Sequence, residues 1–151
     1  MQTKETISED RLSLLKTDAV ISIVDDDESV RKSLKRLLKS IGFETRVFPS
    51  AMEFLNQGPL RAHGCAIIDV RMPEMNGLDL QKRMLSSGIK LPVIFITAHE
   101  DAAIRMQAMA AGAINFLQKP FSDLCLREAI CEALEKSNQA SASPSTVADP
   151  V

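Results

Sequence analysis

Four positions in this sequence carry residue types that together suit phosphoryl transfer. Three consecutive aspartates at 25–27 follow the first apolar run of the chain, and Asp69, Thr97 and Lys119 each end or follow a later one. Clustered carboxylates repel one another and need a cation, and ligands made only of oxygen suit Mg²⁺. An aspartate beside that cation can attack a phosphoryl group, the cation and a lysine can neutralise the transferring oxygens, and a threonine hydroxyl can hydrogen-bond the product.

The elements that must position these residues are five apolar runs, each followed by a helical pattern. The expected strands lie at 19–24, 43–48, 65–69, 92–97 and 113–117. The expected helices lie at 30–41, from 50 onward, at 78–88, at 103–109 and at 124–134. Gly42, Gly88 and Gly112 close three of these helices, and Ser50 with Glu53 forms a capping-box signature.

This alternation predicts an α/β fold with a doubly wound, five-stranded parallel sheet. Uninterrupted apolar runs are typical of strands that are buried on both faces, as in parallel sheets, and five βα units fit the length. The carboxyl ends of parallel strands lie on one edge of the sheet, where open α/β folds bind ligands. We therefore expect the four polar positions to converge on one pocket.

Each polar position also has an ordinary structural explanation. Acids before a helix often cap it, a threonine at a strand end can bond its own turn, and a lysine before a turn proline is usually solvated. The basic run at 31–36 is likewise read as a solvated helix face. All of the ordinary explanations for the four polar positions would have to hold at once, whereas one shared pocket accounts for their common placement.

The chain resembles the receiver domain of two-component response regulators over residues 19–136. The matching segments are VDDDE at 24–28, IIDVRMPEMNGL at 67–78, PVIFITA at 92–98 and GAINFLQKPF at 112–121. Each segment is modest alone, but their order and spacing together are specific. The resemblance implies a flavodoxin-like (βα)5 fold with strand order 2-1-3-4-5.

The same resemblance implies how the pocket works. Asp69 would be the phosphoacceptor. Asp25, Asp26 and Asp69, with the backbone carbonyl of Arg71, would bind Mg²⁺ or Mn²⁺, and Asp26 is the closer match to the direct ligand. Lys119 would contact the phosphoryl group.

The resemblance also implies a switch. Thr97 would turn toward the phosphoryl group while the ring of Phe116 moves inward. The surface of the fourth helix, fifth strand and fifth helix would change as a result. The bond between Lys119 and Pro120 is expected to be cis.

A chain of this kind would be a phosphorylation-dependent signalling switch and not a turnover enzyme. It would receive its phosphoryl group from a sensor histidine kinase or a phosphotransfer protein. It would then regulate a downstream protein target or output domain, with homodimerisation on phosphorylation as a further expectation. Arg71 and His99 lie near the expected pocket, and the sequence leaves open how their side chains affect the phosphoryl lifetime.

Composition argues against several other classes of protein. A net charge of −2 does not favour direct nucleic-acid binding, and the absence of Trp and Tyr argues against a base-stacking platform. Three cysteines without a CxxC motif are read as buried or half-buried apolar residues, not as a disulfide or zinc site. No apolar run approaches the ~18 residues of a membrane span, and the polar N-terminus is unlike a signal peptide, so a cytoplasmic protein is expected.

The expected domain organisation has three parts. Residues 1–18 would form a flexible N-terminal arm, and residues 19–136 the receiver domain. Residues 137–151 are rich in Ser, Ala and Pro and are expected to form a disordered tail or linker. The chain would be either a stand-alone receiver or a piece of a longer protein.

Three alternatives remain at this stage. In a phosphatase of the haloacid-dehalogenase type, Asp25 of an Asp-x-Asp pair would be the nucleophile, but that family needs a later acidic pair after the lysine. Here only Asp123 and Glu128 follow, within a helix. A flavin site would need a donor-rich loop after the first strand, where three acids would repel phosphate. A pseudo-receiver that only binds protein is disfavoured because all four polar positions are present.

Overall fold

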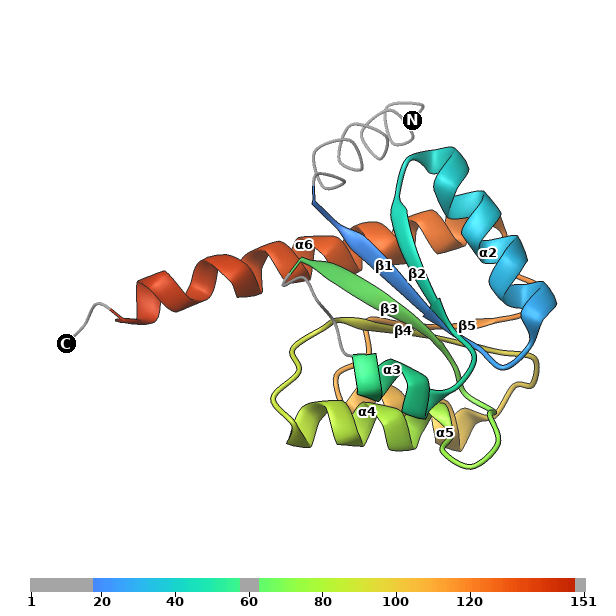
Figure 1. Ribbon diagram of the computed structural model, residues 1–151. Helices are drawn as coiled ribbons and strands as arrows, with labels where there is room; N and C mark the ends of the chain where they lie inside the picture. The colour runs from blue at the N-terminus through green and yellow to red at the C-terminus, as the bar shows by residue number, and fades with distance from the viewer. Residues whose placement is uncertain (1–17, 58–62, 149–151) are drawn as a thin grey trace.

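The computed structural model describes residues 18–57 and 63–148, with side chains in the last helix described as far as Asn138. All but the last residue of the predicted N-terminal arm lie outside these ranges. The strands are β1 (Val20–Val24), β2 (Glu44–Phe48), β3 (Gly64–Asp69), β4 (Val93–Thr97) and β5 (Asn115–Gln118). The helices are α2 (Glu28–Ile41), α3 (Ala51–Gln57), α4 (Gly77–Ser86), α5 (Ala102–Ala110) and α6 (Asp123–Ala148), labelled as in Figure 1.

The five strands form one parallel sheet in the order β2-β1-β3-β4-β5. Strand and helix alternate throughout the described residues, as the sequence predicted, and observed strand ends lie within two residues of the expected ones. The fold is therefore the flavodoxin-like (βα)5 arrangement. Because the sheet is parallel, β1, β3 and β4 bring Val24, Asp69 and Thr97 to one edge.

Helices cover both faces of the sheet, with α2 and α6 on one face and α3, α4 and α5 on the other (Figure 1). Successive residues of β3 show the division, since Ile67 packs in the core under α2 and α6 and Ile68 in the core under the other three helices. Both side chains are fully buried. Burial on both faces explains why the strands read as uninterrupted apolar runs.

The three cysteines divide between core and surface. Cys65 and Cys131 are buried in the core under α2 and α6, as predicted. Cys125 is exposed near the start of α6, so the expectation of partial burial was wrong there. All three are free thiols, and burial raises the pKa of Cys65 to about 12.

Helix ends follow local signals in the sequence. The side chain of Asp27 caps α2 by accepting a hydrogen bond from the backbone N–H of Ser29. Gly42 ends the same helix at φ 109°, a left-handed conformation that glycine adopts without steric cost. Ser50 caps α3 through the backbone N–H of Glu53, with an N···O distance of 3.1 Å. Gly42 and the Ser50–Glu53 pair thus marked the end of one helix and the start of another, as predicted.

The last helix is longer than the sequence pattern indicated. It runs to Ala148 and extends beyond the end of the sheet in Figure 1, through the segment expected to be a tail. Apolar periodicity stops near Leu134, so the pattern gave no sign of the extension, but Ala, Gln and Ser sustain helical hydrogen bonds once a helix is established. Neither α6 nor any other described helix is long and apolar enough to cross a membrane.

Ser137 belongs to the folded unit, one residue beyond the predicted boundary at 136. Its side chain is 1% exposed. Its Oγ accepts a hydrogen bond from the backbone N–H of Gly64 at 3.0 Å and lies 3.1 Å from Nδ1 of His63. These contacts fasten α6 to the amino end of β3.

Gly77 brings the start of α4 close to the end of β3, and we predict that Gly77→Ala destabilises the fold. A Cβ there would lie 2.6 Å from the backbone oxygen of Asp69 and 3.0 Å from the Phe95 ring. Overpacking of this kind costs about 1–3 kcal/mol of unfolding free energy, measurable by urea denaturation. Lys82→Ala, on the exposed face of the same helix, should change it by less than about 0.5 kcal/mol. Equal stability of the two variants would contradict the prediction.

Candidate functional site

Three carboxylates and one lysine converge at the carboxyl edge of the sheet. Ligand oxygens of Asp25, Asp26 and Asp69 all lie within 4.8 Å of one another. Nζ of Lys119 lies 3.4 Å from Oδ2 of Asp25 and 3.8 Å from Oδ1 of Asp69. Residues at or just after the ends of β1, β3 and β5 thus meet in one place, as the topology predicted.

The acidic segment after β1 divides between the pocket and the helix that follows. Asp25 points into the pocket, and its Oδ1 accepts a hydrogen bond from the backbone N–H of Asp27 at 2.8 Å. The side chain of Asp27 instead accepts from the backbone N–H and hydroxyl of Ser29, at 2.9 and 2.7 Å. Asp27 is therefore a helix cap, which is the common structural role of an acid before a helix, and it is not part of the carboxylate cluster.

Arg31 supports the same loop, which sequence reasoning missed. Its Nη1 donates to the backbone oxygen of Asp25 at 2.8 Å from one turn along α2. This arginine was read as part of a solvated basic face, but it is half-buried. Its position near the start of the helix was the available signal, because a long side chain there can reach back to the strand end.

Burial and mutual repulsion disfavour the charged forms of the pocket carboxylates. Asp25 is fully buried and Asp69 is 7% exposed. Burial, and secondarily the charge of Asp25, raises the pKa of Asp69 to about 7, although Lys119 lowers it. Burial also raises the pKa of Asp25, against the hydrogen bond from Asp27 and the Lys119 charge. A cation would relieve both effects, because it neutralises charge that water cannot reach.

Thr97 lies at the end of β4, beside the strand that leads to Lys119. It is 1% exposed, and its hydroxyl is 3.2 Å from both the backbone nitrogen and the backbone oxygen of His99. Thr97 thus bonds its own turn while lying at the edge that carries the acids. The backbone N–H of Lys119 donates to the backbone oxygen of Thr97 at 2.7 Å. The Lys119–Pro120 bond is cis, as expected.

The remaining predicted residues differ in burial. Phe116, on β5, is 2% exposed, and its ring centroid lies 6.2 Å from that of Phe95. The backbone N–H of Arg71 donates to the carboxylate of Asp69 and lowers its pKa, while the Arg71 side chain is exposed. His99 is exposed as well.

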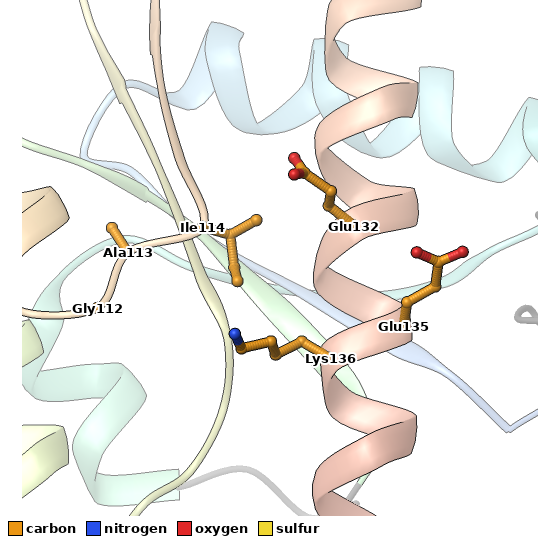
Figure 2. Close-up of a pocket in the computed structure, with 6 residues that line it drawn as sticks. All are labelled: Gly112, Ala113, Ile114, Glu132, Glu135 and Lys136. Carbon is orange, nitrogen blue, oxygen red and sulfur yellow. The ribbon is translucent and has the colours of Figure 1, made fainter.

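A separate pocket of about 380 Å³ lies at the amino end of β5, on the edge of the sheet away from these acids (Figure 2). Its lining residues are Gly112, Ala113, Ile114, Glu132, Glu135 and Lys136. Figure 2 shows Lys136 of α6 extending toward Ile114, in the segment before β5, while Glu135 projects from the other side of the helix in this view. None of the predicted site residues lines it, so the acidic cluster is the candidate site.

The raised pKa of Asp69 predicts a pH-dependent stability in metal-free protein. That pKa is about 7 against 3.8 for an ordinary aspartate. Between these values the folded chain binds more protons than the unfolded chain, so the stability contributed by this group falls as pH rises. Asp69→Asn should therefore raise the unfolding free energy at pH 8 by roughly 2–4 kcal/mol, and by less at pH 5.

Urea denaturation in the presence of a chelator, at pH 5 and pH 8, measures this difference. Glu100→Gln removes an exposed carboxylate and is the control, for which we expect little change at either pH. An Asp69→Asn protein that is less stable than the native chain at pH 8 would contradict the prediction.

Comparisons with known proteins agree with this geometry. The family described as the response regulator receiver domain matches residues 21–131. The response regulator protein TmoT of Ectopseudomonas mendocina is 46% identical over 122 residues, which are 81% of this chain and 56% of TmoT. The transcriptional regulatory protein FixJ of Bradyrhizobium diazoefficiens is 38% identical over 133 residues, covering 88% of this chain and 65% of FixJ.

Solved structures agree at the level of the backbone. The crystal structure titled FixJ-N superposes with a TM-score of 0.74 at 42% identity, covering 78% of this chain and 94% of that one. The chain spans about half the length of the curated relatives TmoT and TodT that it matches. With the parallel sheet in the order β2-β1-β3-β4-β5 and the acids at its carboxyl edge, these matches show that the chain belongs to the response regulator receiver domain family of two-component systems.

Proposed function

We propose that this receiver domain is switched by transfer of a phosphoryl group to Asp69. The observation that carries the proposal is the meeting of Asp25, Asp26, Asp69 and Lys119 at one edge of the sheet. Response regulators are signalling proteins and not turnover enzymes, so the phosphorylated state itself is the product that matters. The donor would be a sensor histidine kinase or a phosphotransfer protein.

The acidic cluster fits Mg²⁺ or Mn²⁺. Its donors are all oxygens, and one residue, Asp26, is exposed at the pocket mouth while Asp25 and Asp69 are buried. Mg²⁺ prefers one or two carboxylates, waters and phosphate oxygens. Asp25, Asp26, Asp69 and the backbone carbonyl of Arg71 would hold the cation. When bound, it would neutralise charge on the carboxylates and on the transferring phosphoryl oxygens.

The chemistry at Asp69 is a displacement at phosphorus. A carboxylate oxygen of Asp69 would form the new P–O bond while the P–N bond of a phosphohistidine breaks, and the departing imidazole would take up a proton. Nζ of Lys119 would stabilise the phosphoryl oxygens, since it already lies 3.8 Å from Asp69. Attack of water on the phosphorus would later release phosphate and restore the carboxylate.

The switch would use Thr97 and Phe116. Thr97 would leave its bonds to His99 for a phosphoryl oxygen, and the turn that leads to α5 would follow. Phe116 would occupy its inward position, which is the buried position in this structure. The surface formed by α5, β5 and α6 would change in consequence and regulate a downstream protein target or an output domain.

We propose a receiver domain that begins at residue 19 and includes Ser137, because Ser137 is buried against β3. The relatives are about twice as long as the matched region. An output domain beyond the helix α6 would account for that difference, and it would place α6 between the switch and the output.

Phosphorylation tests the proposal directly. The native chain is incubated with Mg²⁺ and acetyl phosphate or phosphoramidate, and intact mass is measured. We expect one added phosphoryl group, and none when a chelator replaces Mg²⁺ or in Asp69→Ala. Asp79→Ala removes an exposed aspartate from the first turn of α4 and should be phosphorylated like the native chain.

Other outcomes would select another function. An adduct that survives in Asp69→Ala and disappears in Asp25→Ala, with steady turnover of a phosphomonoester, would favour a phosphatase of the haloacid-dehalogenase type. The absence of any adduct, together with no response to beryllofluoride, would favour a pseudo-receiver that acts only by binding protein.

A further inference from the structure

An exposed arginine on α5 stacks on the buried ring at the centre of the proposed switch. The guanidinium carbon of Arg105 lies over the ring of Phe116, 5.6 Å from its centroid. This distance is within the range of cation–π attraction, in which the positive charge is drawn to the negative face of the ring. Arg105 itself is exposed on α5, whereas Phe116 is 2% exposed.

The contact adds a link between two elements that already pack together, since Ala108 of α5 and Phe116 of β5 lie in the same buried core. Phe116 belongs to β5, at the register position opposite Phe95 of β4, and its ring also approaches that of Phe95. Arg105 belongs to the helix α5, which follows β4. The guanidinium therefore ties a surface helix to a core residue of the neighbouring strand.

The first turn of α5 is also fastened to the loop that begins at Thr97. The Thr97 hydroxyl bonds the backbone of His99, and Asp101 caps the helix by accepting from the backbone N–H groups of Ala103 and Ile104, at 3.1 and 3.2 Å. The backbone N–H of Arg105 donates to the backbone oxygen of Asp101 at 2.9 Å. Hydrogen bonds therefore hold the backbone at both ends of the 97–101 loop, at Thr97 and at the Asp101 cap of the helix that carries Arg105.

We propose that Arg105 is a positioning residue that holds Phe116 in its inward position, through the attraction between its charge and the ring. This inference rests on the proposed function and specifies how that switch is regulated. Because the inward ring accompanies the phosphorylated state in the proposed switch, a residue that stabilises it also favours binding of a phosphoryl analogue at Asp69.

Titration with beryllofluoride in Mg²⁺ tests the proposal. Phenylalanine is replaced by 4-fluorophenylalanine throughout, and the Phe116 signal in ¹⁹F NMR spectra is assigned with Phe116→Leu. Arg105→Gln keeps a polar side chain but loses the charge. We expect it to shift the Phe116 signal before any ligand is added and to weaken beryllofluoride binding about two- to five-fold.

Three further variants separate charge from packing. Arg105→Lys restores a cation and should recover part of the lost affinity. Arg105→Gln in a Phe116→Leu background should have no additional effect, since the ring that the charge attracts is gone. Arg83→Gln makes the same substitution on the exposed face of α4 and should bind like the native chain.

The outcomes are distinguishable. A native affinity and an unshifted Phe116 signal in Arg105→Gln would overturn the inference, as would an equal loss in Arg105→Lys and Arg105→Gln. An undiminished effect of Arg105→Gln in the Phe116→Leu background would also overturn it. If the native chain itself gives no response to beryllofluoride, the proposed function fails before the role of Arg105 is reached.

Discussion

Negative charge collected in a buried place is the constraint on which this structure depends. Asp25 and Asp69 are held at the ends of central strands, where water reaches them poorly. Burial disfavours ionisation of both, the charge of Asp25 raises the pKa of Asp69 further, and Lys119 offsets these effects only in part. Folding thus gathers negative charge at the edge of the sheet, which a cation bound by oxygen ligands would neutralise. In the proposed function, that cation would also bring the phosphoryl group to the site.

The rest of the fold supplies the rigidity that keeps the charges together. Apolar layers on both faces of the sheet fix the directions of β1 and β3, and the acids follow those strands without a long connection. Two hydrogen bonds, from the Asp27 backbone and from Arg31, hold the end of β1 in place. Gly77 allows α4 to begin against the backbone of Asp69. Repulsion therefore cannot be relieved simply by moving the carboxylates apart.

Sequence reasoning located the pocket because a parallel sheet sends every strand end to the same edge, so Asp25, Asp69 and Lys119 could be placed without knowing any contact. The role of Phe116 came only from family resemblance, since one buried phenylalanine looks like another in a sequence. Arg31 could have been suspected from its place one turn into α2, but Arg105 could not. The contact of Arg105 depends on where a long, exposed side chain folds back, and neither periodicity nor spacing records that direction. The extent of α6 was missed because its later residues have no apolar pattern.

The attachment of α6 through Ser137 has a mechanical consequence. The helix starts just after the turn that carries Lys119 and is fastened near the opposite edge of the sheet, to Gly64. Beyond that fastening its backbone continues to Ala148, about 16 Å at 1.5 Å per residue. If the helix pivots at Ser137, a shift of its first turn would move its far end in the opposite direction by a somewhat smaller distance, because fourteen residues of α6 precede Ser137 and eleven follow it. Apolar side chains of α6 as far as Leu134 also bury the helix against the sheet, so core packing and the Ser137 hydroxyl together would set how far its end can move.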